Sequence, residues 1–170
     1  MEFTLRPWLL SDLDSLVKHA NNPAVAANMT DMFPHPYTRE KGLAFLEMVT
    51  AIQPTRIWTI AIDGEACGGI GIHPLTDIMR RNAELGYWLA EPFWGKNIIS
   101  RAIPQAVAMG FSALPEINRI FARPFGTNKA SQRALEKAGF VFETSFQNTI
   151  FKNGVFVDEL FYAIRRKEGA

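Results

Sequence analysis

The alternation of strand-like and helix-like segments constrains the fold of this chain more than any other feature of its sequence. Apolar residues recur at helical spacing in four segments: 11–22, 39–53, 99–114 and 128–140. Strand-type runs stand before, between and after them, which gives the order β-α-α-β-β-β-α-β-α-β-β. That order predicts an α/β fold of the α+β kind, in which helices cover a mixed sheet.

Capping signals mark the ends of several of these helices. Ser11 and Thr38 are the expected N-caps of the first two helices, and Asn128 stands near the start of the last one. Gly139 predicts a left-handed C-terminal cap after that last helix, with Phe140 packing back on its final turn. The helix boundaries are therefore predicted from local chemistry alone.

Turn and breaker residues predict the connections. Asp63-Gly64 and Asn153-Gly154 each separate two strand-type runs and predict tight hairpins, because these residue types tolerate positive φ. Pro104 predicts a kink in the third helical segment, since proline removes one helical hydrogen bond.

Two further stretches are rich in chain breakers. Segment 21–38 contains three prolines and is expected to be a long irregular loop. Gly68, Gly69 and Gly71 could suggest a phosphate-binding loop, but no helix start follows them. A strand with a bulge or a close backbone approach is therefore favoured.

Composition limits the class of protein. A chain of 170 residues, 48% of them hydrophobic and 21% charged, fits one globular domain spanning 1–170. Its formal net charge of +1 predicts no nucleic-acid or anionic-membrane partner. The N-terminus has no secretory pattern and no segment is apolar enough for a membrane span, so a soluble cytoplasmic protein is expected.

Cysteine and histidine usage excludes two kinds of site. Cys67 is the only cysteine, so an internal disulfide is impossible, and a reducing compartment fits this usage. It reads as a small buried apolar residue of a strand. His19, His35 and His73 share no metal-ligand spacing, and no metal is expected.

The junction from Leu85 to Ile103 is the part of the chain that most resembles a binding site. A helix that begins directly after a strand and a short turn directs backbone N–H groups and its positive dipole end at one spot. Gly95 permits a close approach, Asn97 tolerates a left-handed conformation, and Lys96 adds a cation. Pyrophosphate suits this arrangement, although neither a Walker loop nor a GxGxxG fingerprint is present.

Two motifs together carry a family resemblance. The segment AELGYWLAEPFWGKNIISRAI, followed by NKASQRALEKAGFVFE, resembles the GNAT superfamily of acetyl-CoA-dependent N-acetyltransferases, especially its RimJ/RimL-type branch of ribosomal-protein N-terminal acetyltransferases. The resemblance covers essentially the whole chain. It implies a GNAT fold, with a mixed, mostly antiparallel sheet splayed between two strands and helices on both faces. It also implies acetyl-CoA as the acetyl donor, without a metal.

The CoA-binding pattern of that family, Q/R-x-x-G-x-G/A, falls on the junction. Asn97 stands where the family usually has glycine, and Ile99 where it has glycine or alanine. Both are departures, but the pyrophosphate contacts are made by backbone N–H groups, and asparagine is the best non-glycine substitute for an unusual backbone conformation. The cofactor-binding residues that the resemblance implies here are Gly95, Lys96, Asn97, Ile98, Ile99 and Ser100.

The resemblance implies further cofactor contacts. Strand segment 86–89 is expected to splay from its neighbour, so that Tyr87, Trp88 and Leu89 offer backbone groups to the pantetheine arm. Asn128 matches a residue that hydrogen-bonds the pantetheine. From its residue type alone, Asn128 would be only a helix N-cap.

Two residues are expected to be catalytic. Ser131 matches the position of a hydroxyl near the CoA sulfur, and a hydrogen bond to the departing thiolate is expected of it. Glu84 stands where the superfamily commonly keeps a glutamate and could act as a base through water, or could simply form a salt bridge. A second glutamate that the branch uses falls on Ile150 here and cannot be carried over.

The sequence therefore predicts an N-acetyltransferase that moves an acetyl group from acetyl-CoA to a primary amine, with the N-terminal α-amine of a protein as the expected acceptor. A small-molecule amine is the alternative acceptor. A non-catalytic CoA-binding module and a nucleotide-binding regulatory domain are the alternatives from other classes. A monomer and a homodimer both stay open, because an aromatic hairpin near the C-terminus could be a core or a dimer edge.

Overall fold

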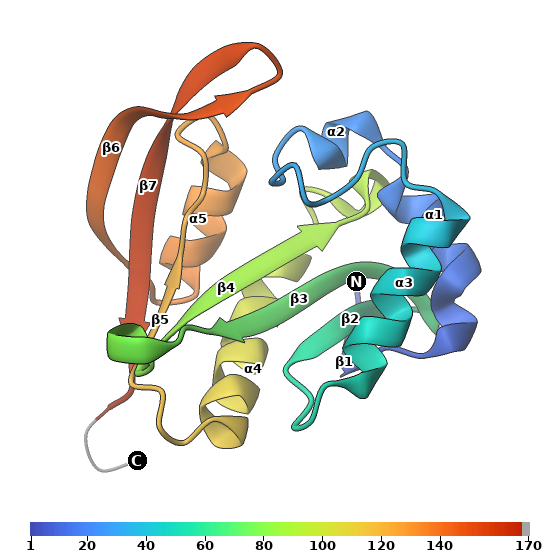
Figure 1. Ribbon diagram of the computed structural model, residues 1–170, viewed down its shortest axis with the longest axis horizontal. Coiled ribbons are helices and arrows are strands. Elements are labelled where there is room, and N and C mark those ends of the chain that lie inside the picture. The colour runs from blue at the N-terminus through green and yellow to red at the C-terminus, as the bar shows by residue number, and fades with distance from the viewer. Residues whose placement is uncertain (168–170) are drawn as a thin grey trace. The chain divides into compact units, whose positions relative to one another are not determined.

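The computed structural model describes residues 1–167. Within that range the strands form one seven-stranded sheet with the order β1-β2-β3-β4-β5-β7-β6, accompanied by helices (Figure 1). The β4–β5 pair is parallel and the pairs β1–β2, β2–β3, β5–β7 and β6–β7 are antiparallel. The predicted mixed, mostly antiparallel sheet is confirmed, and the predicted order of elements is confirmed except for one additional short helix, α2 (Pro23–Ala26).

The chain packs as two compact units, each built from two sequence segments. The first unit comprises Met1–Gly71 and Tyr87–Ile98, and the second comprises 72–86 and the chain from Ile99 onward. The chain passes from one unit to the other at positions within β3, within β4 and at the start of α4. The single domain expected for 1–170 stays a prediction.

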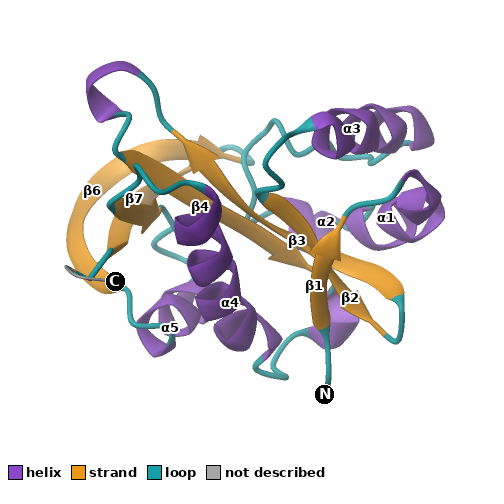
Figure 2. Cartoon of the chain, turned by 90° about the horizontal axis from the view of Figure 1, so that it is seen from below, coloured by secondary structure: helices purple, strands orange, loops and turns teal. Residues whose placement is uncertain are grey.

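The first unit holds the N-terminal strands and three helices around an aromatic core. Trp8, Leu16, Leu46 and Trp88 are buried together there. Helices α1 and α3 lie side by side (Figures 1 and 2), and Gly42 allows their close contact, because a Cβ there would lie 3.0 Å from Leu13. Its elements are β1 (Thr4–Pro7), α1 (Leu13–Ala20), α2 (Pro23–Ala26), α3 (Arg39–Ala51), β2 (Ile57–Ile62) and most of β3 (Glu65–Pro74).

The glycines of β3 allow close packing and do not form a phosphate loop. Asp63 and Gly64 have φ of 50° and 83°, which confirms the predicted hairpin turn between β2 and β3. A Cβ on Gly68 would lie 2.6 Å from the carbonyl oxygen of Trp88. The register of β2 and β3 also shifts between Ile60 and Ala61, so both the close approach and the bulge are confirmed.

The expected N-cap of the first helix was wrong. Ser11 is not the N-cap of α1, which begins at Leu13 after a short 3-10 turn. The carboxylate of Asp12 is instead held by the guanidinium of Arg6, at 2.7 and 2.8 Å, and by the backbone N–H of Leu9.

Segment 21–38 is not irregular throughout, because α2 forms within it. The side chain of Asn22 caps α2 by accepting a hydrogen bond from the N–H of Ala24, and Pro23 occupies the first helical position, where proline is well tolerated. Thr38 caps α3 as predicted, by accepting from the N–H of Lys41.

The second unit contains the C-terminal hairpin and two helices. Its elements are the first part of β4 (Asn82–Leu89), nearly all of α4 (Ile98–Ala113), β5 (Arg119–Ala122), α5 (Lys129–Lys137), β6 (Val141–Lys152) and β7 (Val155–Arg165). Asn153 and Gly154 have positive φ, which confirms the second hairpin. Pro104 lies inside α4, and the kink expected there stays a prediction.

The ends of α5 are as predicted. The side chain of Asn128 accepts from the N–H of Ser131 at the start of the helix. At its end Gly139 has a φ of 88°, and the N–H of Phe140 bonds the carbonyl of Leu135 while its ring is buried. This is the left-handed cap with its apolar contact.

The phenylalanines of the β6–β7 hairpin differ in their exposure, and Phe161 is partly buried. Phe161 stacks on Phe121, whereas Phe146, Phe151 and Phe156 are exposed. Among the described helices, none combines the length and the apolar character needed to cross a membrane.

Candidate functional site

The turn between β4 and α4 has the backbone conformation that the sequence predicts. Gly95 and Asn97 have φ of 73° and 57°, so two left-handed residues flank Lys96 directly before α4 begins at Ile98. The turn is solvent-exposed, whereas the side chain of Ile98 is buried and anchors the helix start. An asparagine at the usual glycine position therefore retains the left-handed geometry.

Side chains of the first unit hold this turn in place. The indole N–H of Trp94 donates to the carbonyl oxygen of Leu89 at 2.7 Å, which ties the turn to the end of β4. The ammonium of Lys96 lies 5.3 Å above the ring of Phe93. Sequence reasoning missed the bond from Trp94, because an exposed tryptophan in a turn carries no specific signal.

The end of β4 can offer backbone groups but not the side chain of Trp88. That side chain is buried and makes an edge contact with Phe33. The parallel register with β5 runs only as far as Glu84 opposite Phe121, although β4 continues to Leu89. The part of β4 that contains the expected pantetheine contacts thus lies beyond the described β5 register, in agreement with the splayed sheet.

Asn128 and Ser131 are brought together at the start of α5. The cap uses the side-chain oxygen of Asn128 and the backbone N–H of Ser131, at 3.1 Å, so the amide nitrogen of Asn128 is not needed for it. Both side chains are partly exposed. The buried Gln132 holds the preceding loop by donating to the carbonyls of Phe125 and Gly126, both at 3.1 Å.

Glu84 forms a bidentate ion pair with Arg123. Nε and Nη2 of Arg123 donate to its two carboxylate oxygens at 2.8 and 3.0 Å, and Nη1 donates to Glu159 at 3.1 Å. The hydrogen bonding of Arg123 to Glu84 is the main reason why the pKa of Arg123 lies above its usual value. The salt bridge considered as the alternative role of Glu84 is present, and sequence reasoning did not identify Arg123 or Glu159 because their positions become adjacent only in the sheet.

The loop between Arg123 and the start of α5 is bonded to β7 within the second unit. Arg123 directly follows β5. The loop after it is held against β7 by a hydrogen bond from the N–H of Gly126 to the carbonyl of Asp158, at 2.8 Å. A bridge between Phe125 and Glu159 continues that contact. The same loop leads into Asn128.

Comparison with known proteins identifies the family. Residues 2–141 match the family described as "Acetyltransferase (GNAT) domain". The chain is 39% identical over 100 residues to the "Uncharacterized N-acetyltransferase YoaA" of Bacillus subtilis (strain 168), covering 59% of this chain and 55% of that protein. It is 28% identical over 108 residues to the "Ribosomal-protein-serine acetyltransferase" of Escherichia coli (strain K12), covering 64% and 59%.

Solved structures show the same architecture. The structure of RimJ from Mycobacterium smegmatis, in complex with CoA-disulfide, matches with a TM-score of 0.80 at 25% identity over 97% of this chain and 82% of that chain. The chain spans somewhat more than half the length of the curated relatives it matches. Because the family match extends over residues 2–141, this chain belongs to the GNAT acetyltransferase family.

Proposed function

We propose that this protein transfers an acetyl group from acetyl-CoA to the N-terminal α-amine of a protein. The observation that carries the proposal is the turn at 95–97, where two left-handed residues precede a 16-residue helix. Backbone N–H groups of such a turn and of a first helical turn point to a common place, and the helix dipole favours an anion there. Pyrophosphate of CoA is the anion that the family binds.

The start of α5 carries the two residues that the family resemblance assigns to the thiol end of the donor. The amide nitrogen of Asn128 donates to the pantetheine, while its oxygen stays in the helix cap. The hydroxyl of Ser131 hydrogen-bonds the departing thiolate. In the reaction the amine nitrogen forms a bond to the acetyl carbon, the carbon–sulfur bond breaks, and the amine loses one proton to water or a base. A thiol has an ordinary pKa of about 8.5, so its departure needs little help.

The ion pair of Glu84 favours an α-amine acceptor. A carboxylate whose two oxygens already accept from Arg123 is suited to orient a water that receives a proton, and not to deprotonate a strongly basic amine. An α-amine with a pKa of about 8 is about one tenth neutral at pH 7, whereas a lysine at about 10.4 is almost wholly charged. The relative named as a ribosomal-protein-serine acetyltransferase supports a protein acceptor.

The test combines cofactor binding with transfer. Acetyl-CoA and CoA are expected to raise the melting temperature, whereas ATP and NAD leave it unchanged. Peptides with a free α-amine are expected to gain one acetyl group, which mass spectrometry detects. The same peptides with a blocked N-terminus and a free lysine are expected to remain unmodified. Stabilisation by CoA without transfer to any amine would leave only a binding module.

Glu84→Gln is expected to lower kcat/KM for the α-amine about tenfold at pH 7, since base assistance is worth about 1.4 kcal/mol when one tenth of the amine is neutral. The deficit is expected to vanish about two pH units higher, where the amine is already neutral. Steady-state rates at both pH values measure this.

Glu159→Gln is the matched control, because it removes the other carboxylate that contacts Arg123 while leaving Glu84. Its rate is expected to stay close to wild type at both pH values. A Glu84→Gln deficit of equal size at both pH values would assign Glu84 a structural role.

A further inference from the structure

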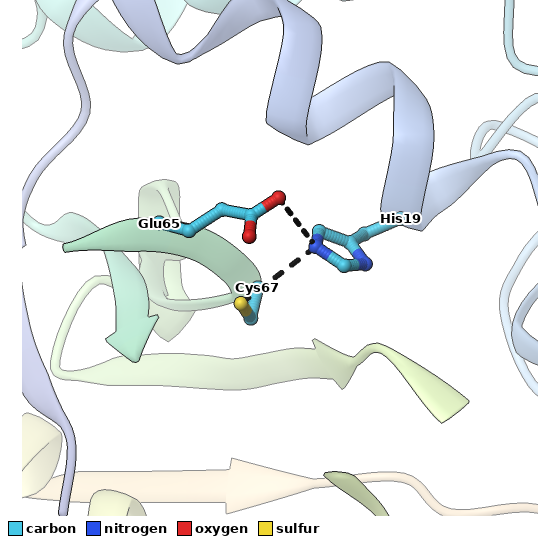
Figure 3. A group of neighbouring side chains, drawn as sticks. All are labelled: His19, Glu65 and Cys67. Carbon is cyan, nitrogen blue, oxygen red and sulfur yellow. Dashed lines mark hydrogen bonds and ion pairs between the residues drawn. The ribbon is translucent and has the colours of Figure 1, made fainter. Parts of the chain in front are cut away.

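A histidine, a glutamate and a cysteine converge within the first unit, apart from the residues assigned above (Figure 3). His19 lies in the last turn of α1, and Glu65 and Cys67 lie two residues apart on β3. Figure 3 shows the imidazole pointing at both the carboxylate and the thiol. No metal-ligand spacing motif in the sequence indicates this cluster, because Glu65 lies 46 positions after His19.

The three donor atoms lie close together. Nε2 of His19 lies 3.0 Å from Oε1 of Glu65 and 3.7 Å from Sγ of Cys67, and one donor from each residue lies within 4.8 Å of the others. Zn²⁺ bonds of about 2.0–2.3 Å at tetrahedral angles place ligand atoms roughly 3.3–3.6 Å apart. We propose that His19, Glu65 and Cys67 form a Zn²⁺-binding site, with water as the fourth ligand.

Burial and packing hold two of the ligands before an ion arrives. Cys67 is 1% exposed and the side chain of His19 is 9% exposed, whereas that of Glu65 is 40% exposed. The carbonyl of Cys67 accepts from the N–H of Ala90 at 2.8 Å, and the ring of His19 makes an edge contact with Phe93. An ion would thus enter from the Glu65 side and meet ligands that need little rearrangement.

The site already attracts a cation. The ammonium of Lys18 lies 2.7 Å from Oε1 of Glu65, and its hydrogen bond is the main cause of the lowered pKa of that carboxyl. The side chain of Lys18 is 63% exposed and can turn into solvent when an ion replaces it. Burial raises the pKa of the Cys67 thiol, so metal binding must release the thiol proton, as is usual for a thiolate ligand.

The bound ion would connect α1 to β3 and would stabilise the folded chain. It would also orient His19 against Phe93, whose ring lies beneath Lys96 of the turn. The consequence expected first is a higher melting temperature, because an ion that binds only the folded chain stabilises it by mass action.

The experiment uses the full chain, freed of metal by a chelator and then given Co²⁺ or Zn²⁺ alone. One Co²⁺ per chain is expected, with a near-ultraviolet thiolate charge-transfer band and the visible absorption of a tetrahedral site. Zn²⁺ is expected to bleach both signals and to raise the melting temperature. The absence of the thiolate band in wild type would overturn the proposal.

Variants test two of the ligands and the competing lysine. Cys67→Ser is expected to abolish the band, Glu65→Gln to weaken binding at least tenfold, and Lys18→Met to strengthen it by removing the competing ammonium. His35→Gln, at an exposed histidine, is the matched control and is expected to bind as wild type. If Cys67→Ser does not fold, the partly exposed Glu65→Gln decides, and unchanged Co²⁺ affinity in that variant would contradict the site.

Discussion

Gly68→Ala is expected to lower the free energy of unfolding by about 3 kcal/mol. This value is at the upper end of the usual cost of adding a carbon atom to a well-packed interior. The added Cβ would stand 2.6 Å from the carbonyl oxygen of Trp88 and 3.2 Å from Cα of Leu89. Both are backbone atoms of β4, so relief requires a shift of the strand and not a change of rotamer. Chemical denaturation of both proteins measures the difference.

Gly64→Ala is the control for glycine removal as such. Its φ is 83°, but nothing lies within 4 Å of the added Cβ, so only the left-handed conformation is penalised, by about 1 kcal/mol. If Gly68→Ala costs no more than Gly64→Ala, then the strand moves easily and the close contact is not a rigid feature of the first unit.

Asn128→Asp is expected to raise KM for acetyl-CoA about tenfold while leaving the melting temperature nearly unchanged. Aspartate caps a helix as well as asparagine does, so the bond from the N–H of Ser131 is kept. The variant lacks the amide N–H donor proposed for the pantetheine, and losing one such bond costs about 1.4 kcal/mol, which corresponds to tenfold in affinity. The measurements are steady-state kinetics and thermal unfolding on the same protein.

Two companion variants separate the roles at this helix start. Asn128→Ala is expected to lose the cap as well, with about 1 kcal/mol of stability. Ser131→Ala is expected to lower kcat and leave KM unchanged, and to keep the cap by Asn128, because that cap uses the backbone N–H of Ser131. A wild-type KM in Asn128→Asp would show that Asn128 is a helix cap and nothing more.

Much of the site could be predicted because it is encoded locally. The left-handed Asn97, the cap at Asn128 and the cap at Gly139 each depend on the conformational preferences of a few neighbouring residues. The same holds for the two hairpin turns. Local signals failed at Ser11, where the bond from Arg6 to Asp12 competes with the expected cap, and in α2, which is too short for a periodic apolar pattern.

The order of elements, the turns and the strand–turn–helix junction could be predicted, because each follows from interactions among residues close in the chain. The partners of Glu84, the burial of Trp88 against Phe33 and the cluster of His19 with Glu65 and Cys67 became known only from the folded chain. These contacts join residues that are many positions apart. Their formation depends on sheet register and helix packing, which no local pattern specifies.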